Sequence, residues 1–269
     1  MQLAKYLERI NYSAPPKVDI ETLFALHRHH LLTIPYEYFD VHLGAPMDIS
    51  IANAYAKIVE RGRGGWCYEM NGLLGWALAE IGFDVRRMAG GVMQSKLGDA
   101  SRNNHLVLGV QLEQKWIVDV GLGDGLIEPI PLLAGDYRQF GFTFRLEQLA
   151  DSWRFHSHAN GAAPNFDFSW QRADEKMLAE KCAWLSSDPS SNFVKNVSCQ
   201  MLTASGYDIQ LGRVAKTITT DGISSRIIDS ADELVASVAE RFGLDLPEIA
   251  NLWDGICQRH EEVMRARDA

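Results

Sequence analysis

A glycine-rich turn leads into a predicted helix at Arg61-Gly-Arg-Gly-Gly-Trp-Cys67-Tyr-Glu-Met-Asn71, with a cysteine at the junction. The helix is predicted by apolar residues at helical spacing, and Gly82 ends the pattern: Met70, Leu73, Leu74, Ala77, Leu78 and Ile81. The N-terminus of a helix carries partial positive charge and unpaired N–H groups, which favour a thiolate and can stabilise an oxyanion. Free cysteines are also among the most buried residues in proteins, so a structural thiol at a helix start is the alternative.

Two predicted strands downstream carry a candidate base and a candidate carboxylate. Residues 106–112 and 116–120 alternate in polarity and are joined around 113–115, as in a hairpin. Because side chains alternate along a strand, His105 and Asp119 share the face opposite the apolar one. A simple hairpin centred on Gln114 places Gly109 opposite Asp119, so a bond to His105 needs twist, a bulge or a different loop. The pattern favours a Cys67–His105–Asp119 relay without fixing its register.

The rest of the chain predicts an α+β fold. Helical spacing occurs at 3–10, 19–31 and 51–61, and in the third segment it places Ala52, Tyr55 and Val59 on one side. Short strands follow at 142–146, 153–155, 166–170 and 214–220, a pattern typical of a barrel or curled antiparallel sheet. Helical spacing returns from Leu234 to Phe242 and again after Pro247.

Composition and charge exclude several classes of protein. The 269 residues are 46% hydrophobic and 23% charged, which excludes disordered, collagen-like and coiled-coil chains. A net charge of −9 argues against nucleic acid or an anionic membrane as the main partner. No apolar run reaches the roughly 18 residues of a membrane span. Lys5, Glu8 and Arg9 interrupt the N-terminal segment, where a signal peptide needs an apolar core, so we expect a cytoplasmic protein.

Metal binding is not expected. The four cysteines, Cys67, Cys182, Cys199 and Cys257, form no Cys-x-x-Cys pair, and we expect free thiols. His27, His29 and His30 lie together, but a closed metal site needs about four ligands. We therefore expect a solvated helix face with one inward histidine.

These motifs together resemble those of the bacterial arylamine N-acetyltransferases, an enzyme family that uses acetyl-coenzyme A. The matching segments are Tyr-Leu-Glu-Arg-Ile (6–10), Ile-Pro-Tyr-Glu (34–37), Lys-Ile-Val (57–59), Arg-Gly-Gly-Trp-Cys-Tyr-Glu-Met-Asn (63–71), His105, Val-Asp-Val-Gly-Leu-Gly (118–123) and Ser-Asn-Phe (191–193). They occur in the family's order over most of residues 1–200. The combination of the cysteine motif with the histidine and aspartate segments is specific, whereas each alone is weak.

The resemblance implies a three-part fold and a set of roles. A helical bundle (1–82) carries the nucleophile Cys67, a β-barrel (83–195) carries the base His105 and the orienting Asp119, and an α/β lid (196–269) follows. The triad arrangement is like that of cysteine proteases. The family uses positions matching Gly123 and Phe193 around the coenzyme, and Asn104 is a further candidate there. A turn glycine, a core phenylalanine and a plain loop amide are the alternatives.

Departures from the family pattern concern the acceptor pocket. Tyr36-Glu37-Tyr38 stands where many members have Phe-Glu-Asn, and Leu122 stands where they commonly have Phe. A pocket relined by Tyr36, Tyr38 and Leu122 is expected to bind different amines. Separately, Glu37 and Arg63 are expected to pair and brace the loop before Cys67.

The expected activity is ping-pong transfer of acetyl from acetyl-coenzyme A, through a Cys67 thioester, to an arylamine or arylhydrazine. We expect a monomer or homodimer. Two alternatives use the same triad: a related thiol acyltransferase or amide synthase, and a papain-like or transglutaminase-like hydrolase. A binding module with a degenerate triad is disfavoured, because all three triad residues are present.

Overall fold

The computed structural model describes residues 1–268, with helices at both ends of the chain and two antiparallel sheets. The α-helices are α1 (Leu3–Arg9), α2 (Ile20–Thr33), α3 (Phe39–Leu43), α4 (Ile51–Tyr55), α5 (Cys67–Ile81), α6 (Gln94–Leu97), α7 (Glu175–Ser187), α8 (Asn192–Lys195), α9 (Ala231–Phe242) and α10 (Trp253–Asp268). A π-helical turn, η1 (Ala56–Glu60), and two 3₁₀ turns, η2 (Gly98–Ser101) and η3 (Pro247–Leu252), complete the helical segments.

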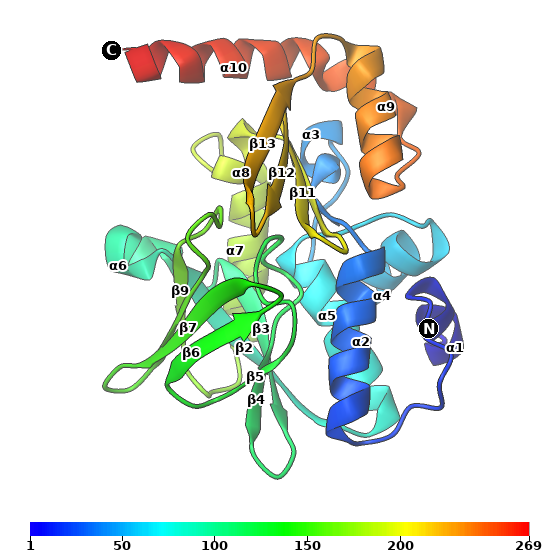
Figure 1. Cartoon of the computed structure of the whole chain (residues 1–269), viewed down its shortest axis with the longest axis vertical. Coiled ribbons are helices and arrows are strands. Elements are labelled where there is room, and N and C mark those ends of the chain that lie inside the picture. The colour runs from blue at the N-terminus through cyan, green and yellow to red at the C-terminus, as the bar shows by residue number, and fades with distance from the viewer. Residues whose placement is uncertain (269) are drawn as a thin grey trace.

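The strands are β1 (Tyr36–Glu37), β2 (Asp84–Val92), β3 (His105–Gln111), β4 (Lys115–Val118), β5 (Ile130–Pro131), β6 (Gly135–Gln139), β7 (Phe142–Gln148), β8 (Trp153–His156), β9 (Asn165–Phe168), β10 (Ser198–Leu202), β11 (Gly206–Leu211), β12 (Val214–Thr219) and β13 (Gly222–Ile227). Figure 1 shows the N-terminal helices beside the green barrel strands, with the yellow-to-red C-terminal part above both. The predicted α+β class is confirmed. Among the described residues, no helix is both long enough and apolar enough to cross a membrane.

The N-terminal helices begin and end where the sequence predicts. The side chain of Asp19 accepts a hydrogen bond of 2.8 Å from the Thr22 amide and so caps α2. Helix α5 starts at Cys67 and stops at Gly82, whose φ of 112° is accessible to glycine. Because α5 packs against other helices and against strands β2 and β3, nearly all of it is buried.

The predicted helix at 51–61 is an α-helical turn followed by the π-helical turn η1. The wider turn shifts the inward face, so that Lys57 and Ile58 are buried and Ala52 is exposed. The predicted apolar side was therefore wrong at Ala52 and correct at Tyr55, while Val59 is half-buried.

Eight strands form a nearly closed antiparallel barrel in the order β5-β4-β3-β2-β9-β8-β7-β6. In the predicted hairpin, β3 pairs with β4 so that Gly109 lies opposite Ile117 and Val110 opposite Trp116. The hairpin is thus centred on Glu113, one residue before the predicted centre at Gln114.

The second sheet has the order β1-β10-β11-β12-β13, and its edge strand β1 comes from the N-terminal part of the chain. Tyr36 pairs with Gln200, and Glu37 pairs with Cys199. Phe39, two residues after Glu37, is fully buried in an apolar cluster formed with α9 and strands of this sheet. The C-terminal part is thus joined to the N-terminal helices by both pairing and packing, and the boundaries at 82 and 195 stay predictions.

Candidate active site

Cys67 is the first residue of α5 and is only 2% exposed. The glycine-rich turn before it lies against the chain that leads into β1. A Cβ atom added at Gly64 would lie 2.1 Å from the Pro35 carbonyl oxygen, so a larger residue does not fit. The turn also carries Trp66, which is fully buried. Close packing therefore fixes the backbone from which the thiol projects.

His105 and Asp119 are bonded to each other, although they are not opposite residues in the ladder. Val118 pairs with Leu108, and continuing the same register puts Asp119 opposite Val107. His105 is then the diagonal neighbour of Asp119 on the same face, within reach of a long side chain. The Nε2 atom of His105 donates to Oδ2 of Asp119 at 2.8 Å. The predicted shared face is confirmed, and the one-residue shift of the hairpin halves the predicted offset between Asp119 and His105 along the strand.

The carboxylate of Asp119 is buried but fully satisfied by donors. Besides His105, it accepts hydrogen bonds from Nδ2 of Asn71 at 2.8 Å and from the Gly121 amide at 2.9 Å, both on Oδ1. Burial alone raises the pKa of Asp119, but the charge of His105 and these hydrogen bonds hold it below its usual range. Asp119 is therefore an anion beside His105.

The imidazole of His105 is also buried, and burial alone lowers its pKa. The Asp119 carboxylate and the Cys67 side chain, which lies within hydrogen-bonding reach, outweigh burial and raise the pKa of His105 to about 10. Since Nε2 is bonded to Asp119, Nδ1 is the ring nitrogen left for Cys67. The arrangement can hold a thiolate beside an imidazolium ion, which is the reactive state of a cysteine nucleophile.

Two residues that the sequence analysis did not single out complete the geometry. A Cβ atom at Gly121 would lie 2.6 Å from Nδ2 of Asn71 and 2.7 Å from Cα of Cys67, so glycine allows the loop after β4 to touch the start of α5. The Asn71 side chain accepts from the Val120 amide at 3.0 Å and donates to Asp119. Its position four residues after Cys67 places it on the same helix face, a spacing that could have identified it.

The residues predicted for the acceptor pocket lie near the triad, and they differ in how deeply they are buried. Tyr36 and Tyr38 are buried, with ring centroids 6.1 Å apart, and Leu122 is half-buried. Burial, followed by the nearby Cys67, raises the pKa of Tyr36 well above its ordinary value, so its phenol is neutral. The ring of Tyr38 meets that of Phe193 at 4.9 Å.

The residues predicted for the coenzyme make contacts within the protein. Phe193 is half-buried and packs edge-on against Trp66, with centroids 5.2 Å apart. Gly123 has a φ of 78°, and a Cβ atom there would lie 2.4 Å from Oε1 of Gln200, so both its conformation and its contact require glycine. The Asn104 side chain accepts from the Val92 amide at 2.7 Å and contacts the Val92 carbonyl at 3.4 Å.

The three neighbouring histidines have separate partners. His27 and His30 are both fully buried, so the expectation of one inward histidine was wrong: helix α2 packs against the molecule along a wider face than the spacing predicted. Burial lowers the pKa of His27 to about 4, and its ring nitrogens contact the carbonyl oxygens of Asp119 and Ile127.

Within residues 1–268, no three His, Cys, Asp or Glu side chains gather in a group that could hold a metal ion. The four cysteines are free thiols.

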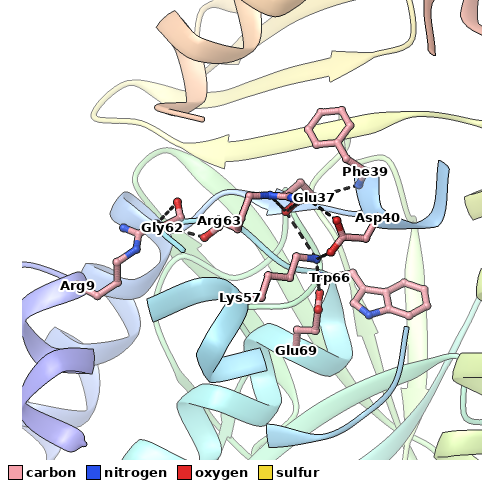
Figure 2. Close-up of polar contacts among 9 residues, drawn as sticks. All are labelled: Arg9, Glu37, Phe39, Asp40, Lys57, Gly62, Arg63, Trp66 and Glu69. Atoms are coloured by element: carbon pink, nitrogen blue, oxygen red, sulfur yellow. Dashed lines mark hydrogen bonds and ion pairs between the residues drawn. The ribbon is translucent and has the colours of Figure 1, made fainter. Parts of the chain in front are cut away.

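Buried charged groups surround the turn before Cys67, as Figure 2 shows. The predicted pair is present, with Nη2 of Arg63 at 2.9 Å from Oε1 of Glu37. Arg63 also bonds Asp40 at 3.0 Å, and Lys57 lies 3.6 Å from Glu37. The sequence analysis gave Lys57 and Asp40 no role, because lysine and aspartate side chains are ordinarily exposed.

Comparison with known proteins identifies the family of the chain. The profile of the N-acetyltransferase family matches residues 19–251. The arylamine N-acetyltransferase of Mycolicibacterium smegmatis is 34% identical, over 93% of this chain and 94% of that protein. A solved structure of the M. smegmatis enzyme superposes with a TM-score of 0.87 at 32% identity, covering 96% of this chain and 98% of that one. The Mycobacterium marinum arylamine N-acetyltransferase in complex with CoA gives a TM-score of 0.85 at 28% identity, covering 96% and 98%. In sequence and in fold, the chain belongs to the arylamine N-acetyltransferase family, and it is an acyltransferase.

Proposed function

We propose that this enzyme transfers an acetyl group from acetyl-coenzyme A to an arylamine or arylhydrazine, by way of a thioester on Cys67. The observation that carries the proposal is the thiol at the start of α5 within reach of a buried His105–Asp119 pair bonded at 2.8 Å. Cys67 is the proposed nucleophile, His105 the acid and base, and Asp119 the residue that keeps His105 charged and oriented.

In the first half-reaction, the Cys67 thiolate attacks the carbonyl carbon of the acetyl thioester. The backbone N–H group of Cys67, at the start of α5, is suited to stabilise the oxyanion that forms, because the first N–H groups of a helix lack partners within it. The bond between the carbonyl carbon and the coenzyme sulfur then breaks, and the coenzyme thiolate takes the proton from the His105 imidazolium. One thioester replaces another, so the step is nearly balanced in free energy.

In the second half-reaction, the amine nitrogen attacks the carbonyl carbon of acetyl-Cys67. His105 accepts the proton that the nitrogen loses, the carbon–sulfur bond to Cys67 breaks, and the N-acetylated amine leaves. This restores the thiolate and the imidazolium together. In this proposed cycle, each half-reaction returns His105 to the protonation state that the other half-reaction needs.

The binding residues follow from the same arrangement. We assign Gly123 and Phe193 to the pantetheine arm, because the first adjoins the segment of Asp119 and the second packs on Trp66, next to Cys67. Asn104 precedes His105 and keeps one amide hydrogen free of its Val92 contact, which suits a carbonyl of the donor. We assign Tyr36, Tyr38 and Leu122 to the aromatic acceptor. The free state of all four cysteines is typical of proteins in a reducing compartment, which supports a cytoplasmic location.

Steady-state kinetics with acetyl-coenzyme A and either aniline or phenylhydrazine test the proposal. We expect parallel double-reciprocal lines, which are typical of an exchange mechanism. We expect Cys67→Ala to abolish transfer. The matched control Cys257→Ala, which replaces a half-buried cysteine of α10, should retain most of the transfer activity. Intersecting lines, or coenzyme-dependent transfer by Cys67→Ala, would contradict the mechanism. Release of acetate with or without amine would favour a hydrolase instead.

A further inference from the structure

Lys57 is almost completely buried, and its ammonium group meets three carboxylates. Its side chain is 2% exposed, and Nζ lies 2.9 Å from Asp40, 3.0 Å from Glu69 and 3.6 Å from Glu37. Figure 2 shows the ammonium between these three groups. The π-helical turn η1 directs this lysine inward, and such turns occur frequently at functional sites.

These carboxylates also bond three different segments around the turn before Cys67. Oε2 of Glu69 accepts from the Trp66 amide at 3.1 Å, at the residue immediately before Cys67. Oε2 of Glu37 accepts from the Phe39 amide at 2.9 Å, at the start of α3. Asp40 and Glu37 together hold Arg63, in the glycine-rich turn itself. The three segments therefore share one cation, Lys57.

Arg9 holds the same turn from its other side through backbone carbonyls. Its guanidinium donates to the carbonyl oxygens of Ile58 at 2.9 Å, Gly62 at 3.2 Å and Arg63 at 3.3 Å. Arg9 thus fixes the path of the turn, but it contacts none of the three carboxylates. Among the described residues, the cations that pair with these carboxylates are Lys57 and Arg63.

The charge of this cluster depends closely on Lys57. Three carboxylates and two cations leave one net negative charge when all are ionised, and burial raises the pKa of Glu69 to about 7 even though Lys57 lowers it. The thiols of Cys199 on β10 and Cys182 on α7 are the further titratable groups nearby, and burial raises the pKa of both, so they are neutral. Removing the lysine charge would leave a second uncompensated negative charge in a buried site.

We propose that Lys57 is a positioning residue for acyl transfer: it neutralises Glu69, and Glu69 in turn holds the Trp66 amide and with it the Cys67 backbone. The inference rests on the proposed role of Cys67 as nucleophile. Without Lys57, ionised Glu69 is repelled by Glu37 and Asp40. The first turn of α5 then shifts relative to His105. A misplacement of the reacting group by about 1 Å can cost about a hundredfold in rate.

Single-turnover acetylation of Cys67 by acetyl-coenzyme A, followed by rapid quench and intact-protein mass spectrometry, tests this role. We expect Lys57→Met to slow acetylation by about a hundredfold at about pH 9, where Glu69 is ionised, and at a temperature where the variant is folded by circular dichroism. The double variant Lys57→Met/Glu69→Gln restores the net charge and keeps an oxygen acceptor for the Trp66 amide. We expect it to recover about tenfold or more of the lost rate.

A matched control separates positioning from stability. Arg241→Met removes a half-buried cation that bonds Asp208 at 2.8 Å on the C-terminal sheet. We expect it to lower the melting temperature but to leave the acetylation rate within about threefold of wild type. The ratio of the Lys57→Met rate to the wild-type rate should rise as pH falls from about 10 to about 7, because the pKa of Glu69 rises further when Lys57 is lost, and protonation of Glu69 restores the net charge.

Acetylation by folded Lys57→Met within about threefold of wild type, or a double variant no faster than Lys57→Met, would overturn the inference. If Lys57→Met does not fold, Glu69→Gln and Glu69→Leu give the same test, since only glutamine keeps the acceptor for the Trp66 amide. Equal rates for those two variants would also overturn it. A wild-type protein that accepts no acetyl group would instead overturn the proposed function.

Discussion

At the scale of single residues, the site depends on opposing effects of burial and charge. Burial alone would strip the proton from His105 and protonate Asp119, and either event would remove the ion pair. The direct bond between them, together with Asn71 and the Gly121 amide on the carboxylate, reverses both tendencies. In the proposed mechanism, the reactive state of the nucleophile thus depends on the buried carboxylate of Asp119.

Replacing that carboxylate should change both the rate and its pH dependence. In Asp119→Asn, burial dominates and the pKa of His105 falls below its ordinary 6.5, whereas in the wild type it lies at about 10. The variant therefore loses its imidazolium at neutral pH, and we expect acetylation of Cys67 to slow by about 10³- to 10⁴-fold. Rapid-quench rates from pH 5 to pH 10 measure this, at about one-unit steps. Equal rates in both proteins at neutral pH, with equal circular dichroism spectra, would make Asp119 a purely structural residue.

Strand parity made the His105–Asp119 pair predictable, because alternation along a strand depends only on residue number. The register was not predictable, since it depends on whether the turn is centred on Glu113 or Gln114, and the polar loop sequence Glu-Gln-Lys permits either. Asn71 was missed because its role depends on a partner far away in the sequence.

At the scale of elements, the glycine-rich turn and the first turn of α5 form one closely packed unit. Gly64 lies against the backbone before β1, and Gly65 forms an isolated bridge with Tyr36. The sequence predicted the turn and the helix start correctly. It did not predict the π-helical turn, because π-helices have no spacing signal distinct from an α-helix over five residues. The predicted apolar side of this segment therefore did not include Lys57.

Adding one methyl group to the glycine-rich turn should lower both the stability of the protein and its rate of acetylation. In Gly64→Ala, the new Cβ atom would lie 2.1 Å from the Pro35 carbonyl oxygen and 2.7 Å from Cγ of Glu37, so the backbone must shift. We expect a loss of about 1–3 kcal/mol in the free energy of unfolding by urea, together with slower acetylation. The control Gly135→Ala places its methyl group in open space and should change neither quantity appreciably. Unchanged stability in Gly64→Ala would show that the turn is not closely packed.

At the scale of the whole molecule, the N-terminal helices and the C-terminal sheet are not independent. Strand β1 pairs with β10, and Phe39 fills the apolar cluster beneath α9. The sequence predicted the order of a helical part, a barrel and a mixed part. It could not predict β1, because a two-residue strand has no periodicity and forms only through its distant partner.

Truncation of Phe39 should therefore destabilise the C-terminal part of the chain. Phe39→Ala removes a fully buried ring, which costs about 3–5 kcal/mol in a core. We expect faster amide hydrogen exchange in β10 and α9, and little change in the barrel strands. The control Phe144→Ala, in a fully buried barrel residue, should show the opposite distribution. Faster exchange confined to residues next to Phe39 would contradict the coupling.

The central claim is that Cys67 carries the acetyl group between donor and acceptor. Mixing the protein with acetyl-coenzyme A alone, followed by intact-protein mass spectrometry and peptide mapping, tests it most directly. We predict one acetyl group on Cys67 before any amine is present, and its discharge on adding an arylamine, with release of the N-acetylated amine and no further coenzyme. Turnover of acetyl-coenzyme A and amine without any acetyl-Cys67 would contradict the account.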